Sequence, residues 1–345
     1  MAREWDVLLF GYYGFGNLGD ELLAKVLVEG LEFLGVPRSR MAILSADPER
    51  SSLDLGVAAI NRWHPLEVFR GLRKSRSLLF GGGGLFQDTT SWRSNLYYWG
   101  VVRMARLAGC LPWAFGQSVG PLNGKFSRFF AADAFRFCAS RVFRDASSVA
   151  FIEDRGMAAR CCPDPVLALE PWEEHFRGEF LLVNVRPWEG DLARKVAEEA
   201  RKMGEKFGLP LLGVGFAPED ILLFETFEKE GLLRCQTLIQ VRTLEDAHTL
   251  ASQACWAFGM RFHFAILCFM MHIPVTCVPY APKVRAFAEE WGLPLWNGEG
   301  EVPIPGDPSR KDRNLRREVL EELRASWMGV CEAVLFREEG GSHEE

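Results

Sequence analysis

Residues 6–34 constrain the fold most, because a strand pattern, a glycine-rich loop and a helix pattern follow one another there. The apolar run Val7–Phe10 is typical of a buried parallel strand. Apolar residues then recur with helical spacing over Asp20–Leu34. Parallel strands are joined by helical crossovers of this kind, so the opening of the chain predicts an α/β fold.

The loop between this strand and helix matches the G-x-G-x-x-G fingerprint of dinucleotide-binding folds at Gly14, Gly16 and Gly19. Asp20 and Glu21 follow the third glycine and would open the helix. Two carboxylates neutralise the positive end of a helix and repel a pyrophosphate, so the loop does not suit NAD. Two interpretations remain open. Either Asp20 caps the helix, or Asn17, Asp20 and Glu21 accept hydrogen bonds from a polyhydroxylated ligand.

Strand and helix patterns alternate along most of the chain, which predicts two doubly wound, Rossmann-like domains that face each other across a cleft. A chain of 345 residues is also too long for one ordinary core. Pro163 and Pro165 interrupt the alternation and mark a linker. We place the domains at residues 1–168 and 176–308, followed by a helix over 309–336 and a polar, disordered tail over 337–345.

The predicted elements locate the candidate site, because ligands of open α/β sheets bind beyond the carboxyl ends of the strands. The first domain is predicted to contain strands at Val7–Phe10, Met41–Ser45, Val57–Ile60, Ser77–Phe80, Leu111–Gly116 and Arg141–Phe143. Its main helices are predicted at Asp20–Leu34, Arg93–Ala108 and Lys125–Ala139. The second domain is predicted to contain strands at Glu179–Val185, Leu209–Val214, Cys255–Phe258 and Ile273–Val278, and a helix at Asp191–Phe207.

Composition excludes some classes of function and indicates the cellular compartment. A net charge of −6 with a pI near 5.7 argues against a nucleic-acid scaffold. The nine cysteines form no C-x-x-C pair, which indicates reduced thiols rather than a disulfide framework. No signal peptide opens the chain, and the apolar stretch 262–278 is too short and interrupted to span a bilayer. We expect a cytoplasmic protein, either free or peripheral at the inner face of the membrane.

Two glycine-rich segments follow predicted strands. The run Gly81–Gly84 is entropically unfavourable as bare backbone, which favours close approach of a ligand over a simple turn. The candidate ligand contacts in this region are Gly82, Gly83, Gly84, Gln87 and Asp88. Gly116–Gly120 matches the G-x-S-x-G nucleophile elbow, but a loop composition follows it where an elbow requires a helix. We therefore treat Gln117 and Ser118 as ligand contacts and not as a nucleophilic site.

Basic residues also follow the predicted strands. Arg144 comes directly after Arg141–Phe143, and Ser147 and Ser148 lie at a predicted helix start, so the three suit an anion clamp. A surface contact between Arg144 and Asp145 is the alternative.

In the second half, Arg186, Arg261 and Lys283 each follow a strand, and His263 interrupts an apolar helical run. His263 is either a satisfied core residue or a functional group. We expect these residues to converge with Arg144 on a site for a small, highly anionic substrate. The histidines show no spacing typical of a metal site, and no Walker lysine follows a glycine loop.

Short segments with a characteristic order run through most of the chain. They are Gly11–Glu21 (GYYGFGNLGDE), Gly81–Ser91 (GGGGLFQDTTS), Gly116–Leu122 (GQSVGPL), Phe143–Ser148 (FRDASS), Pro163–Leu167 (PDPVL), Met260–Ile266 (MRFHFAI) and Pro282–Phe287 (PKVRAF). Together they resemble the polysaccharide pyruvyltransferase family, above all its bacterial branch that pyruvylates cell-wall polysaccharide to anchor surface-layer proteins. Two positions depart from that pattern: Phe262 stands where an aliphatic residue is expected, and Ala281 where an acidic residue is expected.

The resemblance implies a fold like that of GT-B glycosyltransferases, with phosphoenolpyruvate as donor and co-substrate. It also implies a product in which pyruvate bridges two hydroxyls of one sugar as a cyclic ketal, with release of phosphate. In the anchoring branch the sugar is usually N-acetylmannosamine on a lipid-linked precursor. None of these steps requires a redox cofactor, and none formally demands a metal.

The implied roles match the candidate residues. The first domain is expected to hold the acceptor and the second the donor. Cations suit the carboxylate and phosphate of the donor, and the expected donor contacts are Arg144, Arg261, Lys283, Arg186, Ser147 and Ser148. His263 suits the general acid that protonates the donor at C3. Asp20 or Glu21 suits orientation or deprotonation of the sugar hydroxyls, with Gly16 and Asn17 as loop contacts.

Three other functions fit parts of the sequence. An NAD-dependent dehydrogenase would use the glycine fingerprint, but Asp47 lies too far from Gly19 to be the ribose-binding acid. A nucleotide-sugar-dependent GT-B glycosyltransferase would use the same two-domain cleft. A polysaccharide-binding protein without catalysis would leave the cations and His263 at strand ends unexplained.

Overall fold

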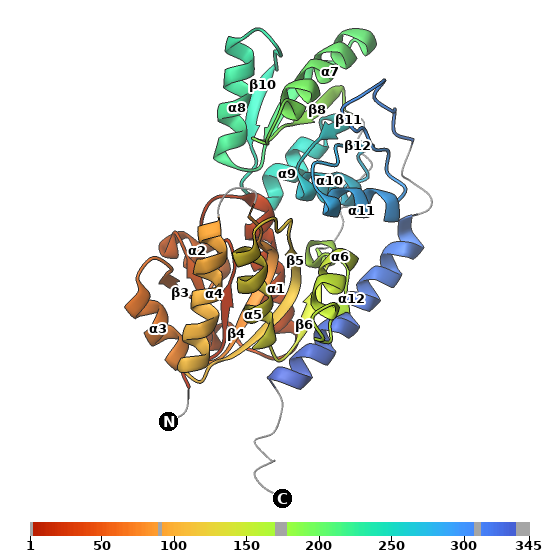
Figure 1. The fold of residues 1–345 in the computed structure, drawn as a ribbon. Helices are drawn as coiled ribbons and strands as arrows, with labels where there is room; N and C mark the ends of the chain where they lie inside the picture. Colours follow the sequence, from red (N-terminus) through yellow and green to blue (C-terminus); the bar gives the residue numbers. More distant parts are fainter. Residues whose placement is uncertain (1–2, 89–91, 170–177, 307–311, 336–345) are drawn as a thin grey trace, which may run out of the picture. The chain divides into compact units, whose positions relative to one another are not determined.

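The computed structural model describes residues 3–88, 92–169, 178–306 and 312–335 (Figure 1). The chain divides into two compact units. The first comprises Met1–Phe15, Asp20–Ala168 and Arg317–Glu345, and the second comprises Gly16–Gly19 and Leu169–Arg316. The tail expected over residues 337–345 lies outside the described residues.

The first unit is built on a seven-stranded parallel sheet with the strand order β3-β2-β1-β4-β5-β6-β7. Its strands are β1 (Trp5–Phe10), β2 (Met41–Ser45), β3 (Ala58–Asn61), β4 (Ser75–Phe86), β5 (Leu111–Val119), β6 (Arg141–Phe143) and β7 (Arg160–Cys161). The register places Val7 of β1 opposite Met41 of β2 and Ser77 of β4. The strand order reverses between β1 and β4, so the loops after these two strands meet at a topological switch point.

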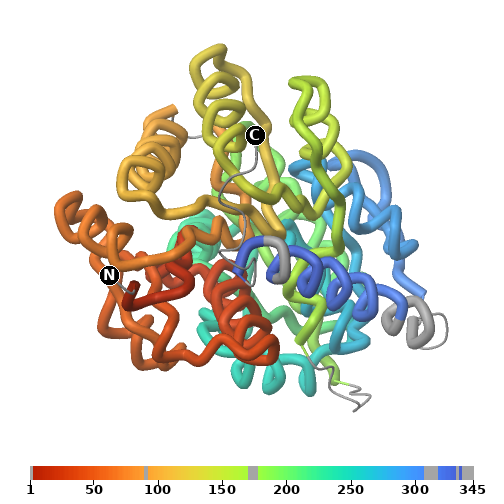
Figure 2. Tube along the Cα trace, turned by 90° about the horizontal axis from the view of Figure 1, so that it is seen from below, coloured from red at the N-terminus to blue at the C-terminus, as the bar shows by residue number. Residues whose placement is uncertain are grey.

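Helices cover both faces of this sheet. They are α1 (Leu18–Phe33), α2 (Pro48–Leu55), α3 (Pro65–Lys74), α4 (Trp92–Leu107), α5 (Lys125–Arg136), α6 (Ala146–Glu153) and α12 (Asp312–Val334), with 3₁₀ helices η1 (Arg38–Arg40) and η2 (Pro165–Ala168). Side chains alternate along β5. Ala114 packs in the core that contains residues of α4 and α5. Phe115 points to the other face, where its ring centre lies 4.2 Å from that of Trp327 on α12. On that second face α12 lies beside α1, because a Cβ at Gly30 would meet the Trp327 ring (Figure 2).

The second unit is built on a five-stranded parallel sheet with the order β10-β9-β8-β11-β12. Its strands are β8 (Phe180–Asn184), β9 (Leu211–Gly215), β10 (Thr237–Gln240), β11 (Ala254–Gly259) and β12 (Val275–Cys277). The helices between and after them are α7 (Leu192–Phe207), α8 (Pro218–Lys229), α9 (Leu244–Ala251), α10 (Phe262–Met270) and α11 (Pro282–Glu290). Here the order reverses between β8 and β11, which defines the switch point of this sheet.

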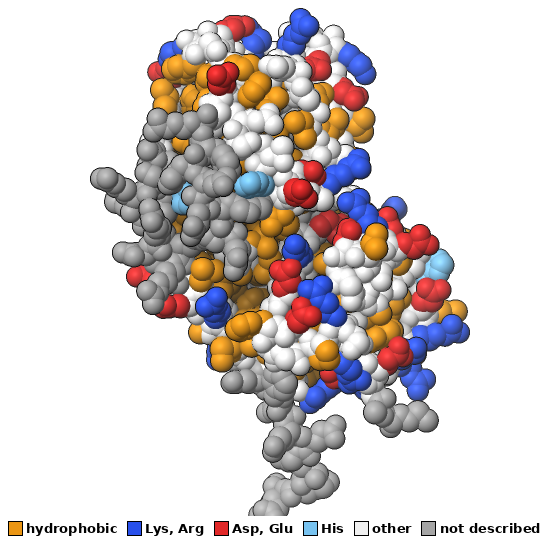
Figure 3. Space-filling view, turned by 180° about the vertical axis from the view of Figure 1, so that it is seen from behind, with side chains coloured by type: hydrophobic (Ala, Val, Ile, Leu, Met, Phe, Trp, Pro, Cys, Tyr) orange, Lys and Arg blue, Asp and Glu red, His pale blue; other side chains and the backbone are white. Residues whose placement is uncertain are grey.

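The predicted fold class is confirmed, because two parallel sheets alternate with helices in a Rossmann-like manner. The predicted bounds Met41–Ser45 and Arg141–Phe143 are those of β2 and β6. The cleft expected between the domains stays a prediction. None of the described helices has the length and apolar character needed to cross a bilayer. Positive and negative side chains are interspersed over the face shown in Figure 3.

One prediction about the strands is wrong. The glycine run at Gly81–Gly84 and the motif at Gly116–Gly120 were expected to follow strands, but β4 continues to Phe86 and β5 to Val119. Pairing continues at Gly83 opposite Gln117, and positive φ angles of 66° at Gly82 and 78° at Gly83 bend the strand there. A loop follows β5 and α5 begins only at Lys125, so the strand-to-helix turn of a nucleophile elbow is absent at this position.

Candidate functional site

The carboxyl end of β1 leads into the loop that carries the acidic residues of the first unit. The helix α1 begins at Leu18, and Asn17 Oδ1 accepts a hydrogen bond from the Gly19 N–H at 3.2 Å. Asn17 therefore caps the helix, and the interpretation of Asp20 as the cap is wrong. Asp20 and Glu21 are half-buried in the first turn, and Glu21 Oε1 accepts a hydrogen bond from the Gly14 N–H at 2.9 Å.

The glycine run lies close to these carboxylates. A Cβ at Gly83 would stand 2.9 Å from Asp20 Oδ1. The Tyr13 hydroxyl donates to the Gly81 carbonyl, and Gln117 Nε2 donates to the Gly82 carbonyl. The protein's own side chains thus approach the bare backbone of the run closely.

The pKa of Tyr13 reflects the charges around it. Burial raises the pKa of Tyr13 well above its ordinary value, and the negative charges of Asp20 and Glu21 raise it further. Asp20 and Glu21 therefore favour hydrogen-bond donors over anions at the carboxyl edge around β1 and β4, and the nearby Arg62 opposes part of their effect.

Asp88 organises the loop that follows β5. Its carboxylate accepts hydrogen bonds from the N–H groups of Asn123 at 2.8 Å and Gly124 at 2.7 Å. Burial raises the pKa of Asp88, but these two hydrogen bonds and the nearby Ser127 hydroxyl help to outweigh it, so the pKa is lowered overall. Asp88 is thus a loop-fixing group, while Gln87 and Gly84 are half-buried beside it.

Arg144 lies in a buried ion pair. Its Nη1 donates to Asp164 Oδ2 at 2.5 Å, and the two side chains are 1% and 2% exposed. Its Nε donates to Ser118 Oγ at 2.7 Å. The alternative of a surface contact with Asp145 is therefore wrong, because the guanidinium is paired with Asp164 in the interior.

Ser147 and Ser148 are engaged by Asp145, which caps α6. Asp145 Oδ1 accepts from the Ser148 N–H at 2.8 Å and from the hydroxyls of Ser147 and Ser148 at 2.6 and 2.7 Å. The Val119 N–H in turn donates to Ser148 Oγ at 2.8 Å. The helix end that we expected to help clamp an anion therefore holds a carboxylate of the protein.

At the switch point of the second sheet, Arg261 is fixed by a bidentate ion pair. Its Nη2 donates to Asp220 Oδ1 at 2.6 Å and its Nε to Asp220 Oδ2 at 3.0 Å, while Glu219 Oε1 accepts from Nη2 at 2.9 Å. The Arg261 N–H donates to Asn184 Oδ1 at 2.8 Å at the end of β8. Burial lowers the pKa of Arg261, but Asp220 and Glu219 outweigh it and raise the pKa above its ordinary value.

Other cations of this edge lie near Tyr280. Arg186 Nη1 donates to the Tyr280 hydroxyl at 3.0 Å, and its guanidinium lies 4.7 Å from the Tyr280 ring centre. Burial raises the pKa of Tyr280, but the positive charges of Lys283, Arg186 and Arg261 more than offset this and lower it below its ordinary value. The positive potentials of these three cations therefore overlap at the Tyr280 hydroxyl, and this edge favours anions.

His263 lies in the first turn of α10 and is half-buried. Its ring centre is 5.2 Å from that of Phe262, and Lys283 Nζ lies 5.6 Å from the Phe262 ring centre. A Cβ at Gly19 would stand 2.0 Å from His263 Nδ1, so this contact requires glycine. Phe262, which departs from the expected aliphatic residue, thereby gives Lys283 a cation–π partner beside the histidine.

The helix α11 begins beside Lys283 without a side-chain cap. Ala281 is its N-cap residue, makes no side-chain cap, and is followed by Pro282 at the first helical position. An acidic residue at 281 would have capped the helix. Its absence leaves the positive end of α11 without a carboxylate from the cap position.

The structure brings Arg186, Arg261 and Lys283 together in the second unit, with His263 in the same unit. Arg144 lies in the first unit, so its predicted convergence with them stays a prediction. Sequence reasoning missed Tyr280 and Asp220. The only signal for Tyr280 was its place after β12, on the same edge as the other strand-end residues.

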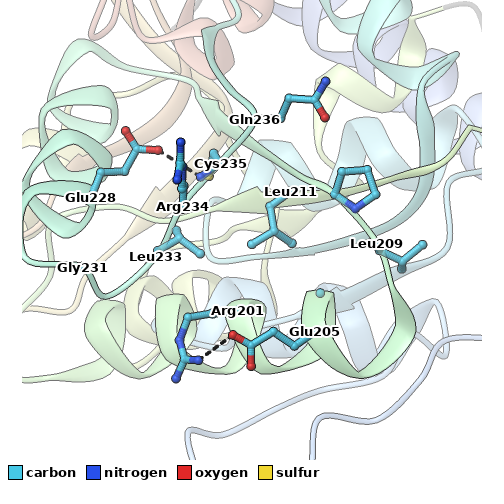
Figure 4. A pocket seen from close by; sticks show the side chains of 12 residues that line it. Arg201, Glu205, Leu209, Leu211, Glu228, Gly231, Leu233, Arg234, Cys235 and Gln236 are labelled. Carbon is cyan, nitrogen blue, oxygen red and sulfur yellow. Dashed lines mark hydrogen bonds and ion pairs between the residues drawn. The ribbon is translucent and has the colours of Figure 1, made fainter.

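Among the described residues, neither a metal site nor the pocket at the amino ends of the second sheet competes with this edge. The described residues contain no group of three or more side chains that could hold a metal ion. A pocket of about 1000 Å³ opens beside Leu211 and Gln236, at the amino ends of β9 and β10 (Figure 4). Arg201 and Glu205 on its rim pair with each other at 2.7 Å. Ligands of such sheets bind at the opposite, carboxyl edge, so we do not assign the active site to this pocket.

The fold is that of the two-domain, GT-B-like α/β class. It is similar to S. aureus MnaA solved with UDP, at 11% identity, 92% of this chain, 91% of that chain and a TM-score of 0.58. It is also similar to Methanocaldococcus jannaschii UDP-GlcNAc 2-epimerase in complex with UDP-GlcNAc and UDP, at 8% identity, 91% and 99% coverage and a TM-score of 0.58. Rickettsia bellii UDP-N-acetylglucosamine 2-epimerase matches at 9% identity, 96% and 100% coverage and the same TM-score of 0.58.

The sequence places the chain in one family within this fold class. The sequence model of the polysaccharide pyruvyl transferase family matches residues 17–282, and the chain belongs to that family. No curated protein matches the chain.

Proposed function

We propose that the protein transfers the pyruvyl group of phosphoenolpyruvate to two hydroxyls of a polysaccharide sugar, forming a cyclic ketal and releasing phosphate. Membership of the polysaccharide pyruvyl transferase family supports the reaction class. The observation that carries the choice of donor is the convergence of Arg186, Arg261 and Lys283 on Tyr280. A donor with both a carboxylate and a phosphate needs several cations at one place.

Within this cluster the cations have different tasks. Arg261 is 7% exposed and already pairs with Asp220, so it supplies a fixed positive field rather than a free ligand. Arg186 and Lys283 are half-buried and suit direct contact with the donor. The positive end of the α11 dipole, which no cap carboxylate neutralises, adds a second favourable potential for the anion. A contribution of Arg144 to donor binding stays a prediction, which is tested below.

His263 is our general acid. It gives a proton to C3 of phosphoenolpyruvate, and the electron pair of the C2–C3 double bond forms the new C–H bond. A sugar hydroxyl adds to the electrophilic C2 and gives its proton to Asp20 or Glu21. That carboxylate releases the proton to solvent, from which the neutral His263 is protonated again. The C2–O bond to phosphate then breaks, and the second hydroxyl closes the ketal while its proton leaves with phosphate.

The acidic residues of the first unit suit the acceptor. Asp20 and Glu21 are half-buried carboxylates that accept hydrogen bonds from sugar hydroxyls or take up their protons. We propose N-acetylmannosamine in a lipid-linked cell-wall precursor as the acceptor. Such a precursor would place the enzyme in the cytoplasm, at the inner face of the membrane.

One experiment tests the proposal directly. The protein is incubated with phosphoenolpyruvate and a panel of lipid-linked and synthetic aminosugar acceptors, and phosphate release is followed together with the mass of the acceptor. Equal amounts of phosphate and ketal-bearing product are expected. Thermal stabilisation by UDP-GlcNAc or NAD, without stabilisation by phosphoenolpyruvate, would contradict the donor assignment and favour a glycosyltransferase or a dehydrogenase.

A further inference from the structure

A row of aromatic rings lies at the carboxyl edge of the first sheet and has no part in the steps above. Tyr12 and Phe15 follow β1, Trp63 follows β3, and Tyr97 lies on α4. We call Tyr12, Phe15, Trp63 and Tyr97 the aromatic platform. All four belong to the first unit.

The rings of the platform contact one another in sequence. Tyr12 stacks on Phe15 with ring centres 4.0 Å apart and planes 8° from parallel. Phe15 meets Trp63 edge to face at 6.1 Å, and Trp63 lies 5.8 Å from Tyr97. Tyr12 is 40% exposed and Trp63 is 56% exposed, so these rings are open to a ligand. Clustered exposed aromatic rings are typical of a binding surface.

A buried arginine holds the platform in place. Arg62 is 3% exposed, and its guanidinium carbon lies 5.0 Å from the ring centres of both Phe15 and Tyr97. Its Nη1 donates to the Gly11 carbonyl at 2.7 Å, and its N–H donates to the Ser45 carbonyl at 2.9 Å. The arginine thus ties the ends of β1 and β2 to the rings that stack on it. A platform fixed in this way loses little conformational freedom when a ligand binds.

Hydrogen-bond acceptors accompany the rings. Gly14 stands between Tyr12 and Phe15 in the chain, and its N–H donates to Glu21 Oε1 at 2.9 Å. A pyranose ring combines an apolar face of C–H groups with hydroxyls along its rim, so flat rings beside carboxylates match both of its parts. An anionic membrane surface would instead be repelled by Asp20 and Glu21.

We propose that the aromatic platform is a sugar-binding subsite, on which one pyranose ring of the glycan stacks against Tyr12 and Trp63. The identification of that glycan as the acceptor rests on the proposed function. The stacking itself does not depend on pyruvyl transfer, so the two can be tested separately.

The first test measures acceptor kinetics at saturating phosphoenolpyruvate, with a synthetic lipid-free disaccharide that contains N-acetylmannosamine. Tyr12→Ala and Trp63→Ala should each raise the acceptor KM about three- to tenfold and leave the donor KM unchanged, because they remove a stacking surface and no reacting group. Trp63→Phe keeps a ring and should recover most of the affinity. Phe33→Ala is the matched control, since Phe33 is 78% exposed at the carboxyl end of α1, and its acceptor KM should equal that of the wild type.

The second test measures binding of the same disaccharide by saturation-transfer NMR without phosphoenolpyruvate. We expect transfer to the sugar ring protons in the wild type and in Phe33→Ala, and weaker transfer in Tyr12→Ala and Trp63→Ala. Such binding without any pyruvyl transfer would overturn the proposed function and support the platform. Pyruvyl transfer with an unchanged acceptor KM in both variants, or no transfer of saturation in the wild type, would overturn the platform.

The third test examines the rival occupant, a lipid surface. Wild type and both variants are sedimented with vesicles of phosphatidylglycerol and phosphatidylcholine, and equal vesicle binding is expected. Vesicle binding that falls in Tyr12→Ala and Trp63→Ala, with an unchanged acceptor KM, would assign the platform to the membrane and overturn the proposal.

Discussion

Tyr13 and Tyr280 lie near the switch points of the two sheets and experience opposite electrostatic environments. The pKa of Tyr13 is raised by burial and then by Asp20 and Glu21. The pKa of Tyr280 is also raised by burial, but Lys283 and the neighbouring arginines lower it below its ordinary value. Two sheets with the same topology at their switch points thus present an acidic edge and a basic edge.

The difference shows how one fold, used twice, can present the two electrostatic environments that the proposed function requires. The acidic edge repels anions and suits the hydroxyl groups of a sugar, while the basic edge suits the carboxylate and phosphate of phosphoenolpyruvate. Backbone geometry does not make this distinction, because both edges are built from the ends of parallel strands. The side chains that follow the strands make it.

The largest effect expected at the basic edge is on turnover. His263→Gln removes the proton donor, so saturated turnover should fall by about 10²–10⁴-fold. The affinity for phosphoenolpyruvate should change much less, because glutamine keeps a hydrogen-bond donor of similar reach. Turnover at saturating donor and donor affinity by titration are measured side by side. Normal saturated turnover would remove His263 from the mechanism and reduce it to an anion ligand at most.

Arg144 belongs to the first unit and tests whether every strand-end cation serves the donor. Arg144→Ala leaves the Asp164 carboxylate buried without its partner, so the free energy of unfolding should fall by about 3–5 kcal/mol. Urea denaturation measures this loss. The control Arg50→Ala breaks an exposed pair with Asp54 in the same unit and should lower stability by about 0.5 kcal/mol or less. Unchanged stability with donor affinity weakened by about tenfold or more would instead make Arg144 a donor ligand.

Lys283 tests the contribution of a half-buried cation to the basic edge. Lys283→Ala should raise the dissociation constant of phosphoenolpyruvate about tenfold or more, because loss of a paired charge in a site typically costs about 2–5 kcal/mol. Isothermal titration measures the change. Lys229→Ala removes an exposed lysine of α8 in the same unit and should bind the donor like the wild type. Equal donor affinity in both variants would take Lys283 out of the donor site.

A tyrosine titration compares the two edges directly. Followed by ultraviolet absorbance, Tyr280 should ionise at lower pH than Tyr13, and Lys283→Ala should move the pKa of Tyr280 upward. The folded-state pKa of Tyr280 lies below its unfolded value, so its contribution to stability is present above the unfolded pKa and is lost as the pH falls through the folded pKa. For Tyr13 the sign is opposite, and its contribution is lost as the pH rises through its folded pKa. If Tyr280→Phe left the first tyrosine titration in place, the edge would not be basic.

The regular part of the fold could be predicted because buried parallel strands are continuous apolar runs. The apolar run 41–44 locates β2 in this way. The extension of β4 to Phe86 could not be predicted, because glycine has low strand propensity and only pairing with β5 keeps Gly83 in the sheet. Local sequence therefore predicts where a strand begins better than where tertiary pairing lets it end.

The strand-end rule found the basic side chains but not their partners. Arg186 contacts Tyr280 across 94 residues of sequence, and Arg261 pairs with Asp220 across 41. Which partner a cation meets depends on how the strands are ordered in the sheet, and that order is not encoded near the cation. Arg144 shows the consequence, since its partner is Asp164 and not the adjacent Asp145.

The smallest expected effect concerns Ala281, which stands where the resemblance leads us to expect an acidic residue. Ala281 is the N-cap of α11 and provides no side-chain cap, so Ala281→Asp should raise the free energy of unfolding by about 0.5–2 kcal/mol through a hydrogen bond to the first helical turn. Urea denaturation measures the gain, and Ala281→Asn separates the cap from its charge. The new carboxylate also lowers the positive potential near Lys283, so Ala281→Asp should weaken donor binding while Ala281→Asn should not. Donor affinity that is equal in the two variants would show that the helix end lies outside the anion site, and the basic edge would then depend on side chains alone.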